Sequence, residues 1–269
     1  MIKIGIIGGS GLYEIQGLIF KKRKEISTPF GKPSDRYTIG QIGNVEIIFL
    51  PRHGRSHNLP PHMINYRANI WGFKKLGVKI IISVNAVGGI KKSLRPGNIV
   101  VPSQIIDMTK NRKSTFYDGR GGISGLRGAV VHIDFTEPYC PEMRRILLKA
   151  GSIAKIPLIN GGTYIAVEGP RLETASEITA FSRIGADIVG MTGMPEASLA
   201  REAEICYSGI SVIANFAAGI SRNKLTTAEV MDAMRASTDK IKKVLKETFK
   251  IISENRKCLC KEALKDTKI

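Results

Sequence analysis

The chain has 269 residues, of which 43% are hydrophobic, and it carries a formal net charge of +18. This length and apolar content suit one large α/β domain, or two small ones, with an ample core. No stretch reaches the roughly 18 uninterrupted apolar residues that span a bilayer, and the N-terminus lacks the pattern of a signal peptide. We therefore expect a globular cytoplasmic protein with no membrane partner.

The positive charge is spread along the chain. Basic residues occur in separate groups at 21–24, 74–75, 91–92, 110–113 and 240–250, and they are not interleaved with aromatic residues as in single-strand-binding surfaces. A lysine-rich solvated surface explains this distribution better than a nucleic-acid partner, which we do not expect. A basic nucleic-acid-binding protein is the alternative, and it rests on the charge alone.

The first predicted element is a short apolar strand that runs into a glycine-rich turn. Residues 3–11 read Lys-Ile-Gly-Ile-Ile-Gly-Gly-Ser-Gly. Glycines allow the positive φ and the close approach with which successive N–H groups and the Ser10 hydroxyl converge on an anion. The run fits neither the dinucleotide-binding spacing nor the P-loop spacing. A plain strand-to-loop turn is the alternative interpretation.

Apolar runs alternate with helix-period segments along the rest of the chain. We expect strands at 45–51, 79–84, 98–102, 162–167, 188–191 and 210–215, and helices at 66–76, 141–154, 174–184, 195–203 and 226–252. Thr226 and Glu229 form a capping-box pattern for the last helix. The alternation predicts a single α/β domain over residues 1–269, with a mixed, mainly parallel central sheet flanked by helices. A polar tail begins at about residue 253, and residues 111–127 form a long loop, a candidate lid or subunit contact.

Polar residues follow several of the predicted strands, where parallel sheets place their ligands. The strand at 45–51 is followed by Arg52 and His53, which offer a planar fork and a further donor to phosphate oxygens. Asn85 opens a predicted glycine turn, and Thr192 follows another strand. Together these strand ends predict a phosphate site. For the Arg-His pair alone, a solvated basic turn is the alternative.

Four cysteines, Cys140, Cys206, Cys258 and Cys260, do not form a metal-ligand spacing. The Cys-x-Cys pair lacks a second cysteine or histidine pair at finger spacing, so we expect no metal site. Cys140 and Cys206 are interpreted as buried thiols. Disulfides in a cytosolic chain would indicate a hyperthermophile.

Five motifs occur in order along the chain: Gly-Ile-Ile-Gly-Gly-Ser-Gly, Pro-Arg-His-Gly-Arg, Asn-Tyr-Arg-Ala-Asn-Ile-Trp, Glu-Gly-Pro-Arg, and Gly-Met-Thr with Pro-Glu. Together they resemble the methylthioadenosine phosphorylase branch of the purine nucleoside phosphorylase family. They lie at 5–11, 51–55, 65–71, 168–171 and 190–196, and the resemblance runs from residue 3 to about 252. It implies a trimer or a dimer of trimers, and phosphorolysis of a purine nucleoside with inorganic phosphate as co-substrate and no cofactor. It also implies that Met191 lies beneath the ribose and that phosphate is held by Ser10, Arg52, His53, Asn85, Ala86 and Thr192.

The residues that would read the base depart from the adenine-specific branch. Members of that branch resemble one another in having a serine after Gly-Pro-Arg-Phe and an Asp-Tyr-Asp run after the late strand. At the first position this chain has Glu173, and at the second it has the run Asn215-Phe216-Ala217. A carboxylate only accepts hydrogen bonds, so Glu173 suits the N1–H of a 6-oxopurine, and the Asn215 amide can donate to O6 or N7. The alternatives are that Glu173 favours a helix N-terminus and that Asn215 caps a strand end.

The 5′ side of the sugar is expected to meet Thr227, Ala228 and Met231, an apolar wall that suits a methylthio group. His132 resembles a residue that reaches the neighbouring subunit's pocket, or is a satisfied strand histidine. S-methyl-5′-thioinosine is therefore the first expected substrate, with inosine and guanosine next, giving hypoxanthine or guanine and a (methylthio)ribose 1-phosphate.

Two alternatives stay close to this family: one keeps the chemistry and changes the base, and the other uses water in place of phosphate. A methylthioadenosine phosphorylase is opposed by Glu173 and Asn215, and a nucleosidase that uses water is opposed by the Arg52-His53 pair. The cysteines resemble those of archaeal thermophilic members in which disulfides occur, which implies bridges within the tail, Cys258 to Cys260, and between Cys140 and Cys206.

Overall fold

The structure is a computed structural model that describes residues 1–9, 15–119, 130–221 and 227–267. Its strands are β1 (Ile2–Gly8), β2 (Ile19–Lys24), β3 (Tyr37–Ile42), β4 (Val45–Pro51), β5 (Ile80–Gly89), β6 (Ile99–Val101), β7 (Gln104–Met108), β8 (Ile159–Asn160), β9 (Thr163–Val167), β10 (Ile188–Gly190) and β11 (Cys206–Phe216). Its α-helices are α1 (Tyr66–Lys75), α2 (Pro141–Ile153), α3 (Ala175–Arg183), α4 (Gly193–Glu202) and α5 (Thr227–Ile251), and two short 3-10 helices are η2 (Pro61–Met63) and η3 (Leu259–Glu262).

One mixed sheet contains all of these strands, with β5 at its centre. β1 and β11 pair with β5 in parallel from opposite sides, and β10 pairs antiparallel with its last two residues. The described strands run in the order β2-β3-β4-β1-β5-β10-β9-β7, while β11, β6 and β8 branch from β5. Parallel pairs outnumber antiparallel ones, which confirms the expected single α/β domain.

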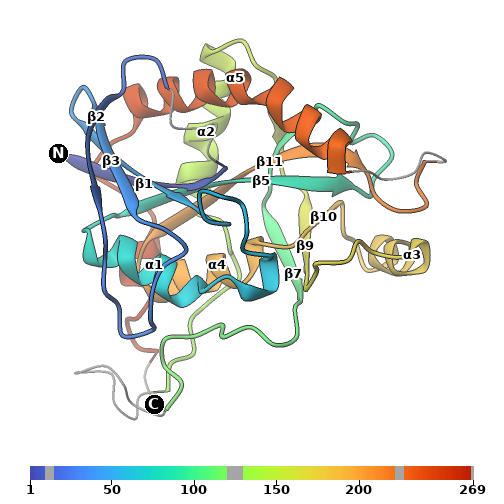
Figure 1. Cartoon of the computed structure of the whole chain (residues 1–269), viewed down its shortest axis with the longest axis horizontal. Helices are drawn as coiled ribbons and strands as arrows, with labels where there is room; N and C mark the ends of the chain where they lie inside the picture. Colours follow the sequence, from blue (N-terminus) through green and yellow to red (C-terminus); the bar gives the residue numbers. More distant parts are fainter. Residues whose placement is uncertain (10–14, 120–129, 222–226, 268–269) are drawn as a thin grey trace.

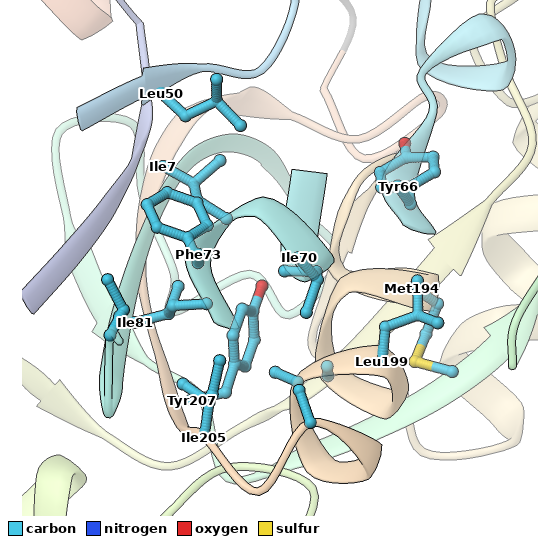
Figure 2. Close-up of a cluster of buried hydrophobic side chains, with 14 of the residues drawn as sticks. Ile7, Leu50, Tyr66, Ile70, Phe73, Ile81, Met194, Leu199, Ile205 and Tyr207 are labelled. Atoms are coloured by element: carbon cyan, nitrogen blue, oxygen red, sulfur yellow. The ribbon is translucent and has the colours of Figure 1, made fainter. Parts of the chain in front are cut away.

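Helices cover both faces of the sheet, with α2 and α5 on one face and α1 and α4 on the other (Figure 1). Alternate residues of each central strand point to opposite faces. Ile6 packs toward α2 and α5 with Phe49, whereas Ile7 packs toward α1 and α4 with Leu50 and Phe73. Figure 2 shows the second of these clusters, in which Tyr207 and Leu199 close the space between β11 and α4. The two faces explain why the central strands are continuous apolar runs.

Predicted helices and observed helices agree to within one or two residues. Thr174 and Ile184, the predicted ends of one helix, are the N-cap and C-cap of α3. The capping box expected at Thr226 lies outside the described residues. A capping box is instead formed at Thr174, which accepts from the N–H of Glu177 while the Glu177 carboxylate accepts from the N–H of Thr174.

Four strands, β2, β3, β7 and β8, were not predicted. Every residue of β2 is exposed, so its sequence, Ile-Phe-Lys-Lys-Arg-Lys, carries no apolar alternation, and its pairing with β3 defines it. The tail after residue 253 is also more ordered than expected, because η3 buries Cys260. Within the described ranges, no helix is both long and apolar enough to cross a bilayer.

The parallel register brings the predicted site segments to one edge of the sheet. Gly8 lies beside Pro51, Ile7 lies beside Ser83, and Ala86 lies beside Val212 of β11. The end of β1 and the residues that follow β4 therefore lie near the second half of β5. This edge is where the candidate site is built.

Candidate active site

Arg52 directly follows β4 and is only 2% exposed. Its Nε and Nη2 donate to the two carboxylate oxygens of Glu196, at 2.5 and 3.1 Å. Nη2 also donates to Ser83 Oγ at 2.6 Å, and Nη1 donates to the carbonyl of Val84 at 3.2 Å. The planar fork that the sequence suggested for phosphate is thus held by Glu196. One Nη1 hydrogen is left for an anion, because a guanidinium has five.

Glu196, in the first part of α4, is fully buried, and both of its carboxylate oxygens accept hydrogen bonds. Besides Arg52, its Oε2 accepts from Ser83 Oγ at 3.1 Å and from the Tyr207 hydroxyl at 2.9 Å. Burial by itself lowers the pKa of Arg52, but the charge and hydrogen bonds of Glu196 outweigh burial and raise that pKa. Sequence analysis did not identify Glu196 as the partner of Arg52, since 144 residues separate them.

His53 lies beside Arg52 and is held by a hydrogen bond of 2.8 Å between Nδ1 and the carbonyl of Leu59. A carbonyl only accepts, so Nδ1 carries the proton. Burial, and next the charge of Arg52, lower the pKa of His53 to about 4. At neutral pH its Nε2 is therefore an unprotonated acceptor. It can receive a phosphate O–H, or take a proton when a dianion binds.

Asn85 and Ala86 do not open a turn, in contrast to the sequence-based prediction. β5 continues to Gly89 because β11 pairs with it over residues 85–89. Gly88 and Gly89 serve close packing: a Cβ on Gly89 would collide with the carbonyl of Leu94. The Asn85 side chain is buried, and its Oδ1 accepts from Ser211 Oγ at 2.8 Å.

Thr192 is the N-cap residue of α4 and is buried. Its N–H and that of Gly193 donate to the Tyr164 hydroxyl at 3.2 and 3.3 Å. These two amides are thus already paired. The Thr192 side chain makes no capping hydrogen bond. Ser10, the other predicted hydroxyl of the phosphate site, lies outside the described residues.

Glu173 lies immediately before the N-cap of α3. The capping role that could have explained it belongs to Thr174 and Glu177, and Arg171 pairs with Glu177 at 2.7 Å. Among the described residues, no side chain forms a hydrogen bond or ion pair with the Glu173 carboxylate. Burial, the largest effect, raises the pKa of Glu173. The N–H of Glu173 itself donates to this half-buried carboxylate, which leaves further acceptor sites for a ligand.

Asn215 lies at a bulge near the end of β11, where the pairing with β5 shifts register. Its Nδ2 donates to the carbonyl of Phe216 at 2.7 Å, which leaves the second Nδ2 hydrogen and Oδ1 unused by that bond. The loop that follows Asn215 reaches α3, because a Cβ on Gly219 would lie 2.7 Å from the Cβ of Ala175. The segments that carry Glu173 and Asn215 therefore meet.

The other two residues predicted to contact the base are Phe216 and Ala217, and Ala217 lies elsewhere than expected. Phe216 lies beside Gly89 and is half-buried. Ala217 is 2% exposed and packs with Val189 and Ile178, so its side chain belongs to the core rather than to the wall of a base pocket. The cause is that the N–H of Ala217 continues the ladder, donating to the Gly89 carbonyl at 2.9 Å.

Arg112, which sequence analysis missed, fixes the segment around Met191. Its Nη1 donates to the carbonyls of Met191 and Met194 at 2.5 and 2.6 Å, and its Nη2 donates to the carbonyl of Glu168 at 2.7 Å. The Met191 side chain packs against Gly169, where a Cβ would lie 2.5 Å from its sulfur. Arg112 stands in the polar 111–127 loop among other basic residues, so no sequence signal distinguishes it.

Among the side chains that the structure describes, the predicted 5′-side residues form no closed wall. Ala228 is exposed and Met231 is 49% exposed at the start of α5, and the side chain of Thr227 lies outside what the structure describes. His132 is exposed, and its backbone N–H donates to the carbonyl of Thr267 at 3.0 Å.

Comparison with known proteins identifies the class that this fold and site define. A family model described as the phosphorylase superfamily matches residues 3–250. The chain belongs to this superfamily.

Curated relatives narrow the class to nucleoside phosphorylases, and the chain is an enzyme of this kind. It is 52% identical to a probable S-methyl-5′-thioinosine phosphorylase of Thermodesulfovibrio yellowstonii, over 98% of this chain and 97% of the relative. It is 46% identical to a 6-oxopurine nucleoside phosphorylase of Pyrococcus furiosus, over 98% of each. It is 42% identical to an S-methyl-5′-thioadenosine phosphorylase of Thermofilum pendens, over 100% of this chain and 99% of the relative.

Solved structures agree with this fold. The crystal structure of a methylthioadenosine phosphorylase from an antarctic soil metagenomic library superposes with a TM-score of 0.92 at 39% identity, covering 100% of this chain and 92% of that one.

Proposed function

We propose that this enzyme cleaves 6-oxopurine nucleosides by phosphorolysis, with S-methyl-5′-thioinosine as its first substrate and inosine and guanosine next. The proposal depends on the Glu173 carboxylate, to which no described side chain forms a hydrogen bond or ion pair. The segment that carries Glu173 also contacts the segment that carries Asn215. The names of the two relatives at 52% and 46% identity support the same base preference.

The reaction exchanges one bond at C1′ of the sugar. As the bond between C1′ and the purine N9 breaks, its electron pair moves into the purine and the sugar becomes oxocarbenium-like. A phosphate oxygen then forms a bond to C1′, and the proton that the hydrogen phosphate gives up goes to the purine, so the products are the free purine and a sugar 1-phosphate. Positioning and electrostatic stabilisation suffice for this chemistry, and no covalent enzyme intermediate is needed.

Glu173 and Asn215 would act on the leaving purine. The Glu173 carboxylate would accept from the N1–H of a 6-oxopurine, and an Asn215 N–H would donate to O6 or N7, where negative charge develops. Adenine presents a lone pair at N1, which would face the carboxylate. A mismatched polar pair of this kind can discriminate by up to ~10⁴.

Phosphate would bind at the edge formed after β1, β4 and β5. We assign its contacts to the remaining Arg52 Nη1 hydrogen, the His53 ring and the hydroxyls of Ser10 and Thr192. Inorganic phosphate is then the co-substrate, with no metal or organic cofactor in the reaction. Because Arg52 is fixed by Glu196, its charge is preorganised and needs no rearrangement when the anion arrives.

The 5′ side supports a homotrimer or a dimer of trimers as the working assembly. Ala228 and Met231 are open to solvent in one chain, and His132 is exposed as well. A neighbouring subunit that covers α5 and contributes His132 would complete an apolar wall for the methylthio group.

S-methyl-5′-thioadenosine is the second candidate substrate. The relative at 42% identity and the superposed crystal structure both carry that name, and the exposed Met231 would suit the same methylthio group. The two candidates differ in the base and share the sugar.

Product analysis separates the candidates. S-methyl-5′-thioinosine, inosine, guanosine and S-methyl-5′-thioadenosine are incubated separately with the enzyme, each with and without phosphate. We expect phosphate-dependent release of hypoxanthine and guanine, and slower release of adenine. Base release without phosphate would indicate a nucleosidase and contradict the proposal.

A further inference from the structure

The four cysteines of the chain converge at one point, although they are distant in sequence. Cys140 is the N-cap residue of α2, Cys206 begins β11, and Cys258 and Cys260 flank the start of η3. Their sulfur atoms all lie within 4.8 Å of one another, and the Cys206 and Cys258 sulfurs are 3.3 Å apart. The four are free thiols, and the two expected disulfides are not formed.

Other contacts hold the tail so that its two cysteines meet the other two. The Glu142 carboxylate on α2 accepts from the N–H groups of Lys257 and Cys258, at 2.8 and 3.0 Å. Arg256 donates from Nη1 to the Lys79 carbonyl and to the Cys206 sulfur, both at 3.1 Å. The tail also packs through Leu264 and Cys260 against the two hydrophobic clusters.

Four sulfurs at this spacing match the ligand set of a tetrahedral metal ion. A tetrahedral Zn²⁺ site with sulfur at about 2.3 Å places its ligands about 3.8 Å from one another. The observed separations, with one pair at 3.3 Å and every pair within 4.8 Å, lie on both sides of that value, so small shifts of the side chains reach the geometry. Spacing in the sequence concealed the site, because the four ligands come from three separate segments.

We propose that Cys140, Cys206, Cys258 and Cys260 bind one Zn²⁺ ion as a structural tetrathiolate site. Zinc fits because it prefers four thiolates in a closed tetrahedron. Each thiol gives up its proton as it binds, so occupancy rises with pH. The ion fastens the C-terminal tail to α2 and β11.

Local charge is consistent with thiolate ligands. The Arg256 guanidinium donates to the Cys206 sulfur, and the N-terminus of α2 lies at Cys140, where the helix dipole favours negative charge. Removing a donor that bonds a metal ligand, as Arg256 bonds the Cys206 sulfur, commonly weakens metal affinity about 10- to 100-fold.

The proposed ion is structural because it lies at the far end of β11 from the catalytic residues. Cys206 is the first residue of β11, and Asn215 is the last but one. At about 3.3 Å per residue, the strand separates them by about 30 Å. Removing the ion should therefore change the stability of the protein and leave the chemistry of the site intact.

The test uses full-length protein purified under reducing, anaerobic conditions. Metal analysis should give one zinc per chain, and replacement with Co²⁺ should give the absorption of a tetrahedral cobalt-thiolate centre. Cys260→Ser should lose at least nine-tenths of the bound zinc, and Arg256→Leu should weaken it by about 10- to 100-fold. Leu259→Ser, an exposed residue between the two tail cysteines, is the matched control and should retain the metal.

Stability is the second measurement, and it stays informative if Cys260→Ser folds poorly. A strong chelator should lower the unfolding temperature of wild-type protein and of Leu259→Ser, and zinc should restore it. Reduced wild-type protein that neither contains zinc nor binds added Zn²⁺ or Co²⁺ would overturn the proposal. Two disulfides found by alkylation of denatured, anaerobically prepared protein would also overturn it.

Discussion

Arg52 and Glu196 form a buried bidentate ion pair across 144 residues of sequence, with Nε to Oε1 at 2.5 Å and Nη2 to Oε2 at 3.1 Å. The pair joins the end of β4 to the start of α4. Ser83 Oγ bridges the two partners, and the Tyr207 hydroxyl donates to Glu196. The charge expected to attract phosphate is therefore part of the core and is fixed in place before any ligand arrives.

Glu196→Gln should destabilise the protein and weaken phosphate binding. Removing one partner of a buried pair typically costs about 3–5 kcal/mol, because the other charge stays buried. The amide keeps the shape and some hydrogen bonds, so we expect a value toward the lower end of that range, with a raised KM for phosphate. Urea unfolding and phosphate kinetics measure the two effects.

Asp232→Asn is the control for that variant. Asp232 pairs with Arg235 at 3.7 Å on the exposed surface of α5, and such pairs contribute about 0–1 kcal/mol. Equal losses of stability in the two variants would contradict the role given to Glu196.

Arg52→Lys should raise the KM for phosphate, lower kcat, or both. Lysine keeps the charge but cannot hold both oxygens of Glu196 while presenting a donor to the anion. Because phosphate is both nucleophile and stabilising charge, we expect kcat/KM for phosphate to fall by about tenfold or more. A folded variant with unchanged phosphate kinetics would remove Arg52 from the site.

His53 should make the protein less stable as the pH falls from about 6.5 to about 4. Its pKa of about 4 in the folded protein lies below the ordinary value of 6.5, so the unfolded chain binds the proton more tightly. The contribution of His53 is then fully present above pH 6.5 and is lost as the pH falls toward 4. Urea unfolding at several pH values should show a smaller loss in His53→Asn, and the exposed His62→Asn should behave as wild type.

Arg112→Lys should lower kcat/KM for the nucleoside more than for phosphate. Lysine cannot bridge the carbonyls of Met191, Met194 and Glu168 at once, so the segment beneath the proposed ribose position should lose its fixed geometry. Steady-state kinetics with each substrate varied in turn measures this split. An equal fall for both substrates would indicate a general loss of structure.

The fold could be predicted where local pattern and tertiary packing agree. α3 follows from apolar periodicity and from the polar residue at its start, Thr174. β5 shows the limit: the Gly88-Gly89 pair is typical of a turn, yet it lies in a strand because β10 and β11 pair with it. These positions are glycine because Val189, Leu94 and Ala217 leave no room for side chains. That crowding depends on β10 and β11 and is not visible in local sequence.

Candidate site residues were predictable by type and position, but their bonding was not. Glu173 and Asn215 stand out because a carboxylate and an amide present complementary groups to a 6-oxopurine. The sequence did not reveal that Glu196 holds Arg52, that Arg112 supports Met191, or that four cysteines meet. Each of these contacts joins segments that are far apart in the chain, so no local spacing records it.

The ratio of kcat/KM for S-methyl-5′-thioinosine to that for S-methyl-5′-thioadenosine, measured in wild-type enzyme and in Asn215→Asp, tests the proposed base preference most directly. The new carboxylate would repel O6 and could accept from the adenine 6-amino group. We expect wild-type enzyme to prefer the 6-oxopurine. The variant should lose a factor on the order of 10² on it, about 3 kcal/mol of transition-state stabilisation, and much less on the adenine nucleoside. A wild-type preference for the adenine nucleoside, or a ratio that the substitution leaves unchanged, would contradict the account.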